Sequence, residues 1–92
     1  MSDSATLPGG WNPYQNPTQE DLAVFNEATN DGHFGGVDYQ PLSVSTQIVA
    51  GINYKFKCVA KNPPPAIAIW EAIVEIFKPL DGPPYVTSIH NI

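Results

Sequence analysis

Few side chains in this sequence have the chemistry of a catalytic or metal site, and they are widely spaced. Cys58 is the one cysteine, and a thiol nucleophile needs a histidine beside it. The alternating residues around Cys58 predict an inward position in the middle of a strand, where a thiol acts as a small apolar filler. His33 and His90 each lack a second histidine or cysteine three or four residues away, the spacing typical of metal ligands. We therefore expect no catalytic residues, no metal and no other cofactor.

Two further patterns resemble functional sites, but a plainer interpretation is favoured for each. Glu71 and Glu75 could share one face of a strand, as the paired carboxylates of a glycosidase do, yet lysines on the preceding strand favour a solvated, charge-balanced surface. The glycine pairs at 9–10 and 35–36 lack the lysine and the strand-to-helix context of a phosphate-binding loop.

Composition limits the size of the fold and the class of partner. Ninety-two residues, 42% of them hydrophobic, are enough for one small domain with its own core. The net charge is -5, with four lysines and no arginine, so nucleic acid is excluded as an expected partner. All four lysines follow residue 54, so the N-terminal half is acidic and would be drawn weakly to a neutral or basic surface.

Nothing in the sequence predicts export or membrane insertion. Residues 1–6 have neither a basic start nor an apolar run, so we expect no signal peptide. The longest apolar stretch, 66–74, is interrupted by Glu71 and is too short to span a bilayer. A single cysteine allows no internal disulfide. The expected location is cytoplasmic, without a membrane partner.

The chain is predicted to consist of a flexible N-terminal arm, residues 1–10, and one domain, residues 11–92. Thr18 followed by Asp21 resembles a capping box, which predicts a helix start. Asn30-Asp31-Gly32 predicts its end after three or four turns. The expected buried stripe of this helix is Leu22, Phe25, Ala28 and Thr29.

The remainder predicts strands. Runs with a period of two begin at Leu42, after Gly51, at Ala66 and at Tyr85, and 11–14 is a candidate short strand. Short connections between the runs predict an α+β fold in which an antiparallel meander of four to five strands wraps around a single helix. The register expected for the two central strands pairs Ala60 with Ala66, Lys55 with Glu71, Tyr54 with Ala72, Phe56 with Trp70 and Cys58 with Ala68.

The meander places two apolar loops at the same end of the sheet. Successive hairpins alternate between the two ends, so loops 48–51 and 80–83 lie together and the proline loop 62–65 lies opposite. Ile48, Val49 and Leu80 are apolar residues where turns are normally polar. Two interpretations remain open: a docking edge, or side chains that fold back onto the core.

Several segments resemble the cystatins, inhibitors of papain-like cysteine proteases. Residues 47–51 (Gln-Ile-Val-Ala-Gly) resemble the QxVxG loop motif. Residues 7–10 (Leu-Pro-Gly-Gly) resemble the N-terminal arm of stefins, and 22–25 (Leu-Ala-Val-Phe) resemble the helix signature of plant cystatins. Residues 70–72 followed by 77–80 resemble the strand that leads into the second hairpin loop. The resemblance covers residues 7–92, and the lack of disulfides matches the stefin-like type.

The resemblance implies a reversible, competitive, tight-binding inhibitor of cathepsin-like proteases, which inserts a wedge made of the arm and two hairpin loops into the active-site cleft. Two departures from the family pattern are Leu80, where many cystatins have tryptophan, and Gly32, which shortens the helix. The residues implied to bind protease are Leu7, Pro8, Gly9, Gly10, Gln47, Ile48, Val49, Ala50, Gly51, Pro79 and Leu80.

Other functions and states also stand as expectations. The main alternative is a non-inhibitory binding or scaffold module on the same fold; a hydrolase using Cys58 or His90 is the least favoured. The active state is expected to be a monomer. Strain at Val49 could open the hairpin into a strand-swapped dimer, which would lose inhibition.

Overall fold

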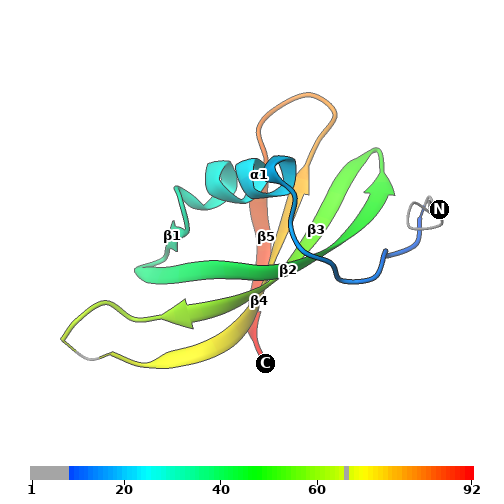
Figure 1. Ribbon diagram of the computed structural model, residues 1–92. Helices are drawn as coiled ribbons and strands as arrows, with labels where there is room; N and C mark the ends of the chain where they lie inside the picture. The colour runs from blue at the N-terminus through cyan, green and yellow to red at the C-terminus, as the bar shows by residue number, and fades with distance from the viewer. Residues whose placement is uncertain (1–8, 66) are drawn as a thin grey trace.

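The protein is an α+β fold in which one helix packs against a five-stranded antiparallel sheet. The computed structural model describes residues 9–65 and 67–92. The sheet order is β1-β2-β3-β4-β5, so every strand pairs with its neighbours in sequence, and the strongly twisted sheet curls behind the helix (Figure 1). The elements in chain order are α1 (Gln19–Thr29), β1 (His33–Phe34), β2 (Val37–Val49), β3 (Gly51–Lys61), β4 (Ile69–Lys78) and β5 (Tyr85–Asn91). The predicted α+β class, with an antiparallel meander and a single helix, is confirmed.

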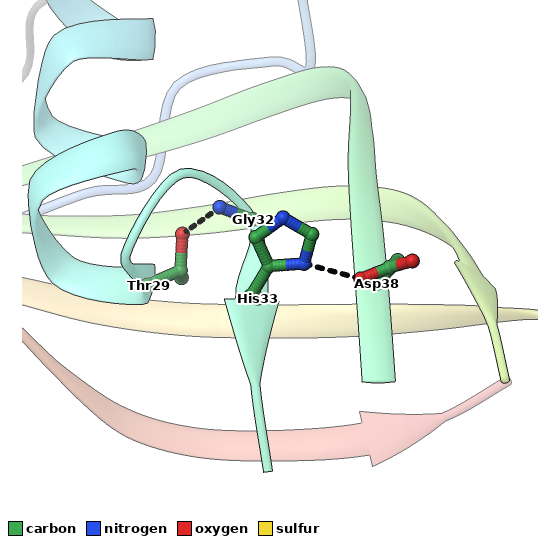
Figure 2. A network of polar contacts seen from close by, with 4 residues as sticks. All are labelled: Thr29, Gly32, His33 and Asp38. Atoms are coloured by element: carbon green, nitrogen blue, oxygen red, sulfur yellow. Dashed lines mark hydrogen bonds and ion pairs between the residues drawn. The ribbon is translucent and has the colours of Figure 1, made fainter. Parts of the chain in front are cut away.

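Both ends of α1 follow from local side-chain chemistry. The Thr18 hydroxyl accepts from the Asp21 N–H at 3.1 Å, and the Asp21 carboxylate accepts from the Thr18 N–H at 3.0 Å, which is the predicted capping box. At the other end Asn30 adopts a left-handed conformation, with φ 58°. The Thr29 hydroxyl accepts from the Gly32 N–H at 2.9 Å and so ties the following turn to the helix (Figure 2).

The buried face of the helix differs in part from the predicted stripe. Phe25 and Thr29 are buried as expected, but Leu22 and Ala28 are only half-buried. Val24 is buried instead. The sheet curls around the helix and covers a helix face that is rotated toward Val24. The periodicity of apolar residues along the helix does not by itself show where this face lies.

The core lies between α1 and the concave face of the sheet. The alternating residues Tyr54, Phe56 and Cys58 of β3 are buried, and their β4 partners Val74 and Ile76 complete the layer. The Phe25 ring meets the Phe56 ring edge to face, with centroids 4.9 Å apart. The predicted inward faces of both central strands are therefore confirmed.

The predicted register of the central strands is wrong by four residues. Ala60 pairs with Trp70, Phe56 with Val74 and Lys55 with Glu75. Likewise Tyr54 pairs with Ile76 and Cys58 with Ala72. The Asn62 N–H donates to the Ala68 carbonyl at 3.1 Å across a loop longer than predicted, because prolines 63–65 have no N–H with which to continue the ladder. A shift by an even number of residues keeps every side chain on its predicted face.

Strand boundaries differ from the prediction in several places. β4 begins at Ile69, later than predicted, and β2 and β3 extend into the predicted loop 48–51 so that only Ala50 lies between them. β2 begins at Val37 rather than Leu42, and Leu42 itself is the unpaired, exposed residue of a bulge between Pro41 and Ser43. The short β1 pairs with the start of β2 inside what the sequence indicated was a glycine-rich loop. The candidate strand 11–14 is not formed. Trp11 makes an isolated bridge to Gln47 of β2, and Gln15, just after this segment, makes another to Val44.

Candidate functional site

The β2–β3 hairpin and the β4–β5 loop lie at the same end of the sheet, as predicted (Figure 1). The β3–β4 connection lies at the opposite end. Between the two loops is a shallow groove of about 290 Å³. It is lined by Ile48, Val49, Gly51, Ile52, Lys78, Pro79 and Leu80. The groove therefore joins residues of both predicted binding loops into one surface.

The apolar tips of this surface point into solvent. Leu80 is 76% exposed and Val49 is 41% exposed, and Ala50 between the strands is exposed as well. Ile48 and Pro79 are half-buried at the sides of the groove. Val49 and Leu80 thus do not fold back onto the core, and apolar area remains available at both tips.

Gly51 holds the first hairpin close to the end of β4. Its φ of +118° is one that other residues rarely adopt, and a Cβ atom there would lie 2.5 Å from the Lys78 carbonyl oxygen and 2.9 Å from the Phe77 ring. Only glycine permits this close approach. Packing within the chain therefore explains why the last residue of the QxVxG-like segment, Gly51, is a glycine.

The base of the N-terminal arm is bonded to the same hairpin. The Gly9 N–H donates to the Ile48 carbonyl at 3.0 Å, and the Gly9 carbonyl accepts from the Gln47 side-chain amide at 3.0 Å. Gly10 follows at the edge of this contact and is half-buried. Leu7 and Pro8 lie outside the described residues. We refer to residues 9–10, 47–51 and 79–80 together as the binding rim.

Residues 11–15 continue along the free edge of β2. The Asn12 N–H donates to the Thr46 carbonyl at 2.8 Å, and its side-chain amide donates to the Thr46 hydroxyl at 2.9 Å. The Ser45 hydroxyl donates to the Asn12 carbonyl at 2.6 Å. The Trp11 ring carries the Lys55 ammonium 4.1 Å from its centroid. Sequence reasoning did not predict these contacts.

Cys58 lies in the core and has no contact with the binding rim. It is fully buried on β3, and burial raises the pKa of its thiol to about 12, so the thiol stays protonated at neutral pH. The thiol donates to the Phe56 carbonyl at 3.5 Å. The predicted inward position is confirmed.

The two histidines each face a carboxylate away from the rim. His33 pairs with Asp38 beside the turn that follows α1 (Figure 2), and His90 on β5 lies 3.6 Å from Glu75. Across residues 9–65 and 67–92, no three His, Cys, Asp or Glu side chains gather closely enough to hold a metal ion.

A second hollow, of about 470 Å³, lies at the opposite end of the sheet. It is lined by His33, Asp38, Tyr39, Gln40, Val59, Lys61 and Ile69. It is larger than the groove at the rim, but none of the residues that sequence reasoning assigned to binding lies in it.

No helix within the described part of the chain is long and apolar enough to cross a membrane. Comparisons of the chain with models of protein families, with curated proteins and with solved structures find no match.

Proposed function

We propose that the protein is a reversible, competitive inhibitor of papain-like cysteine proteases on a cystatin-like fold. The observation that carries the proposal is the binding rim itself. The arm base is hydrogen-bonded to the first hairpin, and the two exposed apolar tips, Val49 and Leu80, flank a groove at the same end of the sheet. Three segments distant in sequence thereby form one narrow, largely uncharged edge.

The chemistry of this edge suits blocking a cleft rather than reacting within it. Apolar side chains gain free energy when they leave water, about 25 cal/mol for each Å² buried. The Gly9 backbone groups are already bonded to the hairpin before binding, so less conformational entropy is lost when a protease is bound. In this proposal residues 7–8 enter the substrate pockets on one side of the catalytic thiol, and Leu80 covers the other side.

The decisive experiment titrates papain with the full chain and with a chain that lacks residues 1–8. The full chain is expected to inhibit competitively, to release active papain on dilution and to remain uncleaved by mass spectrometry. Full burial of one leucine contributes roughly 1.5–3 kcal/mol, so the truncated chain should dissociate about tenfold faster or more. Its association rate should change little, because both loops remain.

Circular dichroism provides the control for folding in both chains. A folded full-length chain that leaves papain fully active would overturn the proposal and favour the alternative, a non-inhibitory binding module. If truncation slowed association alone, inhibition would stand but residues 1–8 would not be the anchor.

A further inference from the structure

Gln47 connects the arm to β3 through both ends of its side-chain amide. Its Oε1 accepts from the Asn53 Nδ2 at 2.9 Å, and its Nε2 donates to the Gly9 carbonyl at 3.0 Å. Asn53 stands directly opposite Gln47 in the β2–β3 pairing. The three residues form a relay that runs from the hairpin end of β3, across β2, to the base of the arm.

The direction of the Gln47 amide decides whether this relay attracts or repels the arm. An amide can present either its NH2 group or its oxygen to a neighbour. Toward the Gly9 carbonyl only the NH2 group is attractive, since two carbonyl oxygens repel. The Asn53 NH2 group occupies the Gln47 oxygen and so holds the NH2 group of Gln47 toward Gly9.

Gly9 is thereby held on both of its backbone polar groups. Its N–H donates to Ile48 and its carbonyl accepts from Gln47. The first hydrogen bond restrains the direction in which the Gly9 N–H points. The second restrains the Gly9 carbonyl on the other side of the same α-carbon. Together they favour the left-handed conformation observed at Gly9, φ +78°.

We propose that Asn53 is a positioning residue, which orients the Gln47 amide and through it the Gly9 carbonyl, so that the arm leaves the binding rim in the direction that a protease cleft accepts. This inference rests on the proposed function. Asn53 is half-buried beside the rim and has no place in the QxVxG-like segment. Its role is to preorganise the arm rather than to touch the protease.

The test compares Asn53→Asp with Asn53→Ala. Aspartate keeps the size of asparagine but only accepts hydrogen bonds, so it attracts the Gln47 NH2 group and turns the Gln47 oxygen toward the Gly9 carbonyl. Alanine at this position removes the partner of the Gln47 side-chain amide but does not attract its NH2 group away from Gly9. Asn53→Asp should therefore raise the papain dissociation rate about tenfold and Asn53→Ala about threefold, with association rates within about twofold of the parent chain. If the effect came from lost packing instead, Asn53→Ala would raise the dissociation rate more than Asn53→Asp, since only alanine removes side-chain volume.

Gln40→Glu is the matched charge control. Gln40 is an exposed glutamine at the other end of β2, so this variant adds the same negative charge far from the rim. Its dissociation rate should equal that of the parent chain. Gln47→Met keeps the length of the side chain without either hydrogen bond and provides a second variant should Asn53→Asp fail to fold. Its dissociation rate should rise at least as much as that of Asn53→Ala, because it also loses the bond to Gly9.

Amide hydrogen exchange in the free protein tests the relay without any protease. In Asn53→Asp the Gly9 amide should exchange faster, while the Asn12 and Gln15 amides, which donate to Thr46 and Val44, keep their protection. Unchanged Gly9 exchange, or faster exchange with an unchanged dissociation rate, would overturn the positioning role. If the parent chain does not inhibit papain, the proposed function fails by itself, and faster Gly9 exchange would still support the relay as the device that orients the arm.

Discussion

The Gly51 α-carbon faces the Lys78 carbonyl so closely that a Cβ atom on Gly51 would lie 2.5 Å from that oxygen. The first hairpin and the end of β4 therefore meet backbone against backbone. This contact sets the spacing of the two loops at the binding rim and gives the groove between them its width.

Gly51→Ala should destabilise the fold by at least about 2 kcal/mol, because it adds both a strained backbone conformation and a clash. Urea unfolding followed by circular dichroism measures the effect. Gly82→Ala is the control: its φ of +119° is nearly the same, but its Cβ would meet only the Pro79 ring, at 3.6 Å. If the two variants lost equal stability, the contact with Lys78 would contribute nothing.

Gly9→Arg should leave the fold intact and weaken papain inhibition by orders of magnitude. A Cβ on Gly9 would meet no atom of the described residues within 4 Å, so the added side chain would collide with the bound protease and not with the folded domain. The strain of a side chain at φ +78° is the same in the control variant. The matched control is Gly36→Arg, which has φ +79°, equally open space and a position in the turn between β1 and β2. Inhibition constants for both variants provide the measurement. Equal inhibition by the two would remove Gly9 from the contact.

Leu80→Ala should weaken inhibition about tenfold with almost no change in the free energy of unfolding. The side chain is 76% exposed in the free protein, so its apolar area is buried only on binding. Ile69→Ala removes a similarly exposed side chain, 66%, at the opposite end of the sheet and should not affect inhibition. An effect of Ile69→Ala equal to that of Leu80→Ala would show that the affinity comes from general hydrophobicity.

The Cys58 thiol should make stability depend on pH in the alkaline range. Burial raises the pKa of Cys58 from 9.0 to about 12, so above pH 9 the unfolded chain loses this proton while the folded chain keeps it. The unfolded state then binds fewer protons, and stability falls as pH rises, by at most about 1.4 kcal/mol per pH unit. Burial, reinforced by negative charge on Asp21 and Glu20, also raises the pKa of Tyr54, which acts in the same direction at higher pH.

Comparison with Cys58→Ala isolates the contribution of the thiol, because the tyrosines are common to both chains. Urea unfolding between pH 8 and pH 10 should give a steeper decline for the parent chain than for Cys58→Ala. Parallel curves would contradict the raised pKa. Papain inhibition should survive in Cys58→Ala, since the thiol is buried away from the binding rim.

The position of α1, the side-chain faces and the location of the loops could be predicted from the sequence because they depend on neighbours a few residues apart. Thr18 and Asp21 specify where the helix begins, and Asn30 specifies where it ends. Alternation around Phe56 and Val74 specifies which side chains face inward, and this holds even though the predicted pairs were four residues out of register.

Tertiary structure alone decided the register and the base of the arm. Lys55 faces Glu75 and not Glu71 because loop length and core packing select among registers that alternation leaves equivalent. The bonds from Gly9 to Ile48 and from Gln47 to Asn53 and Gly9 join three separate parts of the chain. No period or local motif encodes the two bonds to Gly9, because they form only once the curled sheet has brought the free edge of β2 beside residues 9–15. The bond between Gln47 and Asn53 crosses the β2–β3 hairpin and depends on its register.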